Sequence, residues 1–261
     1  MNNSLSFDRA ADFYDQTRPL PEAITRQGVQ AILEQVGLRA RILDVGTGTG
    51  RISIPLLEQG ADLVGCDLSA SMLRRLQEKR PGARILQADA SRLPFPSAQF
   101  EAVLTVHVIH LIAPWQEALR EFKRVLVPGG VYLNVRTYNS VGKSIRDEIR
   151  RHWRDWVEAH GVKIHQPGVQ DYEPFLQELR QMGANLTEVE VVRFPIPFTL
   201  RQHLDRFTGR VFSDAWDIPD DVYAASLEEL RPWVAQKYGD LDEPRSDEVR
   251  FTIDAARFAG V

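Results

Sequence analysis

Three glycines that alternate with threonine follow an acidic residue early in the chain. Residues 42–50 read ILDVGTGTG, so Asp44 precedes Gly46, Gly48 and Gly50. A buried strand that runs into such a turn is typical of nucleotide sites. Glycine accepts positive φ and lets a ligand come into contact with the backbone. The sequence therefore predicts a nucleotide-type site on this loop.

The spacing of the glycines separates two classes of nucleotide binder. The dinucleotide fingerprint G-x-G-x-x-G needs a third glycine at 51, counted from Gly46, or at 53, counted from Gly48. Arg51 and Ser53 occupy these positions. Asp44 also stands where a dinucleotide-binding strand is usually apolar. A nicotinamide-dependent oxidoreductase on a similar fold is therefore the less favoured alternative.

Two more acids end the next two apolar runs. Asp67 ends the run 61–67, and Asp89 follows the run 83–88. A carboxylate placed shortly after a glycine loop can accept both O–H groups of a ribose diol. Because the carboxyl ends of parallel strands share one edge of a sheet, these two acids and Asp44 predict one common site.

The order of these motifs resembles the class I S-adenosylmethionine-dependent methyltransferases. D-x-G-x-G-x-G resembles motif I of that family, and residues 121–130, EFKRVLVPGG, resemble its R-V-L-x-P-G-G signature. The resemblance runs from about Asp8 to Tyr138, and beyond Tyr138 it concerns layout only. It is closest to the small-molecule branch that includes ubiquinone and menaquinone biosynthesis. It implies S-adenosylmethionine as cofactor and a small, partly apolar methyl acceptor.

The resemblance also implies roles for single residues. Asp67 would bind the ribose hydroxyls, and Asp89 the adenine amino group, with the backbone beside it at Ala90 on a ring nitrogen. Tyr14 would close on the methionine portion of the donor, whose carboxylate suits the guanidinium of Arg18. The resemblance further assigns to the donor site Asp44, Gly46, Thr47, Gly48, Gly50, Leu68, Met72 and Val106. No metal site is predicted.

A catalytic base is optional for this chemistry. Methyl transfer from a sulfonium is an in-line displacement in which alignment supplies most of the acceleration. A base is needed only when the acceptor must lose a proton of high pKa. His107, just after the run 100–106, is the candidate base, with packing against adenine as the alternative. A non-catalytic module that binds S-adenosylmethionine or S-adenosylhomocysteine also stays open.

The composition and net charge limit the classes of partner that we expect the protein to bind. The 261 residues are 43% apolar and 26% charged, with a net charge of −4, which argues against binding to nucleic acid or to an anionic membrane. The single cysteine, Cys66, excludes an intrachain disulfide and fits a reducing compartment. The sequence shows no charged-then-apolar leader and no long apolar span, so we expect a cytoplasmic protein. The oligomeric state stays open.

Alternating strand and helix patterns predict an α/β fold. We expect a Rossmann-like, doubly wound, mostly parallel seven-stranded sheet with a helical cap insertion, in one methyltransferase domain over 1–261. Its expected parts are an N-terminal helical segment 1–35, a donor-binding core 36–137, an extra helix and sheet completion 138–198, a cap insertion 199–240 and a last strand 241–261. Helices are predicted at 28–36, 69–80, 115–126, 141–160 and 171–182.

Overall fold

The computed structural model describes residues 4–18, 20–139, 144–165 and 167–260. The chain divides into two compact units. Unit 1 comprises Met1–Thr137, Pro167–Val192 and Phe251–Val261, and unit 2 comprises Tyr138–Gln166 and Arg193–Arg250. All the predicted site residues belong to unit 1, whereas the insertion 199–240 belongs to unit 2.

Seven strands form one sheet in the order β3-β2-β1-β4-β5-β7-β6. The strands are β1 (Arg41–Val45), β2 (Asp62–Asp67), β3 (Ile85–Gln87), β4 (Phe100–Val106), β5 (Leu126–Asn139), β6 (Ala184–Phe198) and β7 (Arg245–Phe258). β1 pairs in parallel with β2 and β4, and β2–β3 and β4–β5 are parallel as well. The strand order reverses at β1, which is where open α/β sheets bind ligands. The predicted fold class is confirmed.

The helices of unit 1 follow the predicted positions closely. They are α1 (Tyr14–Thr17), α2 (Glu22–Val36), α3 (Ser53–Glu58), α4 (Ala70–Lys79), α5 (Trp115–Val125) and α7 (Tyr172–Gln181), with 3-10 turns η1 (Asp8–Ala10) and η2 (Ile109–Leu111). Ser69 is the N-cap of α4, because its hydroxyl accepts the N–H of Met72. α2 begins six residues before the predicted start at 28, directly after Pro21.

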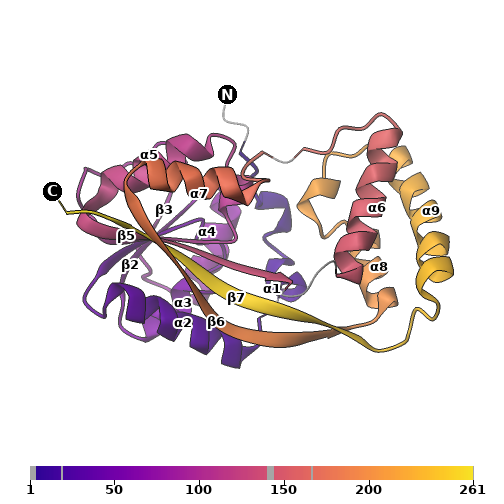
Figure 1. Ribbon diagram of the computed structural model, residues 1–261, viewed down its shortest axis with the longest axis horizontal. Helices are drawn as coiled ribbons and strands as arrows, with labels where there is room; N and C mark the ends of the chain where they lie inside the picture. The colour runs from indigo at the N-terminus through magenta and orange to yellow at the C-terminus, as the bar shows by residue number, and fades with distance from the viewer. Residues whose placement is uncertain (1–3, 19, 140–143, 166, 261) are drawn as a thin grey trace. The chain divides into compact units, whose positions relative to one another are not determined.

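Helices cover both faces of the sheet in unit 1, with α5 and α7 on one side and α2 and α3 on the other (Figure 1). Alternate strand residues point to the α5 side, where they pack with α5 and α7. This core cluster includes Leu43, Val45, Val103, Tyr132, Leu119, Phe122, Phe175 and Leu179. Side chains on one face of the strands repeat every second residue, and those on one side of α5 repeat about every 3.6 residues. The apolar members of both sets pack together in this cluster. This packing fixes the carboxyl edge of the sheet, where the glycine loop begins.

The Pro-Gly-Gly sequence lies inside a strand rather than before one. A Pro-Gly-Gly sequence usually turns the chain ahead of a strand, but β5 already begins at Leu126. Phe100 of β4 pairs with Leu126, whereas Ala102 pairs with Val131, so β5 carries a bulge between these pairs. Gly129 within it has φ 80°, a conformation that glycine adopts without strain.

Unit 2 has its own apolar core around α6 (Ile145–Ala159), α8 (Leu200–Thr208), α9 (Asp220–Tyr238) and the 3-10 turn η3 (Ser213–Ala215). On α6 the side chains of Ile149, Trp153 and Val157 form a buried apolar stripe. The indole of Trp153 donates to the Ser226 hydroxyl at 3.0 Å. The predicted residues 141–143 of this helix lie outside the described residues. The insertion is helical, and its action as a cap stays a prediction.

The core under α5 should set the stability of unit 1. Phe122→Ala removes a ring that is 1% exposed, so we expect a loss of about 3–5 kcal/mol in the free energy of unfolding. Arg120→Ala, on the exposed side of the same helix, should stay within about 0.5 kcal/mol. Urea unfolding followed by circular dichroism measures both. Equal losses in the two variants would contradict this packing.

Candidate functional site

The glycine loop begins where β1 ends beside β2. The amides of Gly46 and Thr47 both donate to the Cys66 carbonyl, at 2.7 and 3.0 Å. The loop glycines at 46, 48 and 50 have φ values of 74°, 56° and 87°. Backbone hydrogen bonding between β1 and β2 thus continues for two residues beyond Val45, the last residue of β1, into the turn.

The three glycines differ in what surrounds them. A Cβ on Gly46 would lie 2.3 Å from the Val108 side chain, and a Cβ on Gly50 would lie 2.8 Å from Ile54. A Cβ on Gly48 would meet only the Gly46 carbonyl, at 3.9 Å. The outer glycines therefore pack against protein, and the middle one borders open space. A ligand can approach the backbone there.

Asp44 lies buried beneath the loop and is 2% exposed. Its Oδ2 accepts from the Ser53 hydroxyl, which also contacts the Thr47 hydroxyl. Burial raises the pKa of Asp44 to about 6, against the lowering effect of the Ser53 and Thr47 hydroxyls. Within the described part of the chain, its Oδ1 is buried and has no hydrogen-bond partner. Asp44 thus holds the loop on one side and keeps an unsatisfied acceptor on the other.

Asp67 joins the glycine loop to the start of α4. Its Oδ2 accepts the amide of Gly48 at 2.9 Å, and its Oδ1 accepts the amide of Ser69 at 2.8 Å. Burial raises the pKa of Asp67, while these amides lower it. A carboxylate has about four acceptor positions, so two backbone bonds leave capacity for two hydroxyls. The carboxylate is thereby oriented beside Gly48.

The other predicted donor-site residues of β2 and β3 follow in order. The Ala88 amide donates to the Asp67 carbonyl at 3.0 Å and brings the ends of the two strands together. Asp89 accepts from the amide and the hydroxyl of Ser91, at 2.9 and 2.8 Å, so it shapes its own turn. The Leu68 carbonyl accepts from the Gln87 side chain at 2.9 Å. Ala90 is half-buried and Met72 is 2% exposed.

The N-terminal segment is tied to the glycine loop and to α4 by polar contacts. The Thr49 hydroxyl donates to Asp15 at 2.6 Å, and the Arg51 guanidinium donates to the Arg18 carbonyl at 2.9 Å. The Ser69 hydroxyl donates to Asp8 at 2.7 Å and is the main cause that lowers the pKa of Asp8 to about 2. Sequence reasoning missed these contacts of Asp8 and Asp15.

Tyr14 and Arg18 stand together in this segment. The Tyr14 ring meets the Phe7 ring edge-to-face, with centroids 5.9 Å apart. The Arg18 guanidinium lies 5.6 Å from the Tyr14 centroid. The structure therefore brings both predicted residues to the segment that contacts the glycine loop.

His107 directly follows Val106, the half-buried last residue of β4. Its φ is 57°, which is uncommon outside glycine, and its amide donates to the Val135 carbonyl at 3.0 Å. Its Nε2 lies 3.0 Å from the Thr137 hydroxyl. Burial, followed by the charges of Arg51, His110 and Arg18, holds the pKa of His107 well below its usual range. The imidazole is therefore neutral near pH 7.

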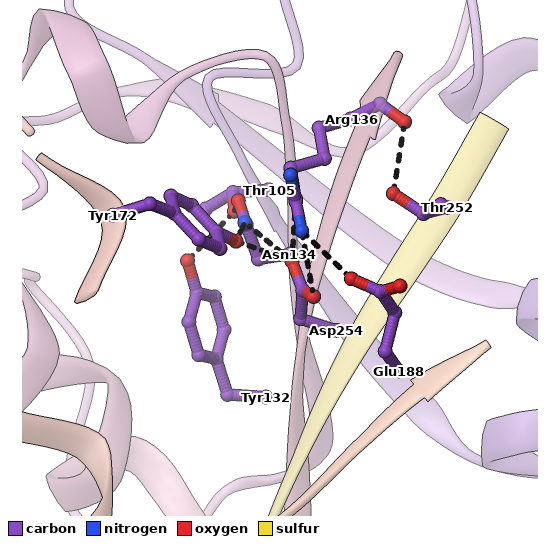
Figure 2. Close-up of polar contacts among 8 residues, drawn as sticks. All are labelled: Thr105, Tyr132, Asn134, Arg136, Tyr172, Glu188, Thr252 and Asp254. Carbon is purple, nitrogen blue, oxygen red and sulfur yellow. Dashed lines mark hydrogen bonds and ion pairs between the residues drawn. The ribbon is translucent and has the colours of Figure 1, made fainter. Parts of the chain in front are cut away.

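A buried polar network lies beside this strand end. Figure 2 shows Asp254 at its centre, with the Tyr172 hydroxyl donating to it and the Asn134 amide donating at 3.2 Å. Arg136 donates to Asp254 and to Glu188, both at 2.9 Å. Burial, followed by the charge of Asp254, raises the pKa of Tyr172, which therefore keeps its proton.

The network extends to neighbouring strands. Thr105 donates to Asn134 at 3.2 Å and contacts the Tyr132 hydroxyl at 2.8 Å. The Thr252 hydroxyl donates to the Arg136 carbonyl at 3.5 Å. β4, β5, β7 and α7 are thereby joined next to Thr137, the residue that contacts His107. No sequence motif indicated this network.

The residues that the structure describes contain no group of three or more His, Cys, Asp or Glu side chains arranged to hold a metal ion. Among them, no helix combines the length and the apolar character needed to cross a membrane.

Comparison with known proteins gives a family match and partial relatives. Residues 43–134 match the family described as "Methyltransferase domain". A demethylmenaquinone methyltransferase of Beutenbergia cavernae is 36% identical over 127 residues, which cover 48% of this chain and 53% of that protein. A malonyl-[acyl-carrier protein] O-methyltransferase of Enterobacter lignolyticus is 32% identical over 151 residues, 57% of each chain. The chain thus spans about half the length of these relatives.

A solved structure shows the same fold over the whole chain. The [4+2]-cyclase SpnF is 17% identical, with a TM-score of 0.61, and the match covers 98% of this chain and 94% of that one. Because that protein is called a cyclase, the fold alone does not assign a reaction.

The raised pKa of Asp44 gives a pH-dependent stability. A folded-state pKa of about 6, above the ordinary 3.8, stabilises the fold below pH 3.8, and this contribution is lost as the pH rises through 6. The change is at most about 3 kcal/mol. Asp44→Asn, which cannot ionise, should lack this loss in urea unfolding between pH 4 and 7.5. Parallel pH curves for the two proteins would contradict the assignment.

Proposed function

We propose that this chain is a class I S-adenosylmethionine-dependent methyltransferase, which transfers a methyl group from S-adenosylmethionine to a small acceptor. One observation carries the proposal. The open space beside Gly48 is bordered by a carboxylate, Asp67, that two backbone amides orient and that retains acceptor capacity. A nucleoside with a free ribose diol fits this arrangement.

The residues present fit the donor. Asp67 would bind the ribose hydroxyls, and the loop backbone at Gly46, Thr47, Gly48 and Gly50 would lie along the donor. The unsatisfied, buried Oδ1 of Asp44 offers an acceptor beneath the loop. We assign the adenine end to Asp89, Ala90, Leu68, Met72 and Val106. Tyr14 and Arg18 would face the methionine portion, where the guanidinium suits the carboxylate.

S-adenosylmethionine supplies an activated methyl group on a sulfonium, and its transfer leaves S-adenosylhomocysteine. The protein's part is to hold and align. Asp67 and the glycine loop fix one end of the donor, and the N-terminal segment would cover the site and exclude water. None of these tasks requires a residue to form a covalent bond.

His107 is the proposed base for an acceptor that must lose a proton. For Nδ1 to accept that proton, Nε2 must carry the other one and donate to Thr137, which lies 3.0 Å away. The lowered pKa keeps the imidazole neutral and able to accept. Packing against adenine is the alternative role.

The acceptor is proposed to be a small, partly apolar molecule, rather than nucleic acid or membrane lipid. The curated relatives are named as methyltransferases of demethylmenaquinone and of malonyl-[acyl-carrier protein], and methylation at oxygen, nitrogen or carbon stays open for this chain. The buried single cysteine, Cys66, favours a reducing compartment such as the cytoplasm. The cap role of 199–240 is part of this proposal.

Titration calorimetry with S-adenosylhomocysteine tests the donor site. Wild-type protein should bind it saturably and should not bind NADH. Asp67→Ala should weaken binding by at least about tenfold, because hydrogen bonds to a charged acceptor contribute about 1.5–3 kcal/mol. Asp62→Asn, at the other end of β2 and paired with Arg84 at the surface, is the matched control and should bind normally.

Each other outcome has a distinct meaning. NADH binding in place of S-adenosylhomocysteine would support the oxidoreductase alternative. Donor binding without turnover on any acceptor would favour a non-catalytic module. Equal weakening by the Asp67 and Asp62 variants would remove Asp67 from the site.

A pH profile tests His107. Because only neutral imidazole accepts a proton, kcat/KM should rise through the lowered pKa of His107 and be level above pH 6.5. His107→Gln should lower kcat by about 10²–10⁴ if the acceptor must lose a proton. A variant with unchanged kcat and pH profile would favour the packing role.

A further inference from the structure

Arg51 is a cation at the edge of the donor loop. It directly follows Gly50 and is half-buried. Its hydrogen bond goes to the Arg18 carbonyl at 2.9 Å, and no carboxylate of the described residues pairs with it. Lys79, which contacts the same loop at the Thr49 carbonyl, is in contrast paired with Asp15 at 2.5 Å. Of these two cations, Lys79 has an acidic partner in the described part of the chain and Arg51 has none there.

The charge of Arg51 acts on the proposed acceptor side. The charged groups that shift the pKa of His107 are Arg51, His110 and Arg18, and all of them lower it. No acid is among the groups that shift the pKa of His107. The two acids Asp44 and Asp67 instead raise the pKa of Cys66. The charged groups that act on the pKa of His107 are thus cations.

Donor binding would not neutralise this region. Under the proposed function, the single carboxylate of the donor pairs with Arg18, while its ammonium and sulfonium add positive charge. Arg51 would then remain half-buried without a counter-ion among the described residues, and partial desolvation of an unpaired charge costs free energy. An anion that arrives with the acceptor would remove this cost.

We propose that Arg51 binds a carboxylate of the methyl acceptor, so that the substrates are organic acids. This inference rests on the proposed function. The planar guanidinium can donate two parallel hydrogen bonds to a carboxylate, and one of its nitrogens is already held by the Arg18 carbonyl. That backbone bond fixes the guanidinium in place before the acid binds.

Matched acid and amide probes test the inference. Protein saturated with S-adenosylhomocysteine is titrated with benzoate and benzamide, and with octanoate and octanamide. In at least one pair the acid should bind about tenfold or more tightly than its amide, because a charged hydrogen-bond pair is lost in the amide. Arg51→Gln should reduce this preference to less than about twofold, since the neutral amide keeps a donor but lacks the charge.

Two control variants separate charge from anchoring. Arg51→Lys keeps the charge and should retain part of the preference, with weaker binding because lysine lacks the planar fork. Arg120→Gln, an exposed arginine of α5, should leave both titrations unchanged.

A separate titration measures the affinity for S-adenosylhomocysteine. The affinity of Arg51→Gln should stay within about threefold of wild type, whereas Arg18→Gln should lose about tenfold or more.

The outcomes distinguish this inference from the proposed function. If wild-type protein does not bind S-adenosylhomocysteine, the proposed function fails. If it does bind, three results overturn the inference alone: no preference for acid in either pair, a preference that survives in Arg51→Gln, or a loss of S-adenosylhomocysteine affinity in Arg51→Gln. The last result would assign Arg51 to the donor side, either to the donor carboxylate or to anchoring of the segment that carries Arg18.

Discussion

The hydrogen bonds from the Gly48 and Ser69 amides to Asp67 are the constraint on which the site depends. They join three elements that the sequence separates: the glycine loop after β1, the end of β2 and the start of α4. Since the amides occupy only part of the carboxylate's capacity, the same group can order the protein and receive a ligand. Asp44 performs the comparable task below the loop through the Ser53 hydroxyl. Two carboxylates thus hold one turn from opposite sides.

The other half of the site is organised from β5. Arg136 and Thr137 are neighbours, and their side chains serve two different purposes. Arg136 enters the network around Asp254, while Thr137 contacts His107. Because Asp254 and Asn134 are buried and satisfied by defined partners, this strand end has one favoured arrangement. The left-handed φ of His107 is therefore held by the fold, which keeps the imidazole at a fixed position next to Thr137.

Local sequence patterns predicted the parts of the fold that local forces determine. Asp44, Asp67 and Asp89 follow apolar runs, and Ser69 stands at the start of a helical pattern. The strands, the glycine loop and the helix after β2 could therefore be predicted from the sequence. The Asp254 network joins residues up to 120 positions apart, and the contact between Thr49 and Asp15 spans 34. Such contacts leave no periodic signal. The bulge of β5 was missed for a related reason, because Pro-Gly-Gly is typical of a turn and pairing with β4 decides otherwise.

The glycine loop is one short segment that would link the proposed donor and acceptor sites. Its backbone borders the ligand space at Gly48, while the side chains of Thr49 and Arg51 contact Asp15 and the Arg18 carbonyl. The residues between the ligand and the N-terminal segment are therefore consecutive. A shift of this backbone on ligand binding would act directly on the segment that carries Tyr14 and Arg18. Because the charge of Arg51 also lowers the pKa of His107, the proposed acceptor would meet a charge that this same loop carries.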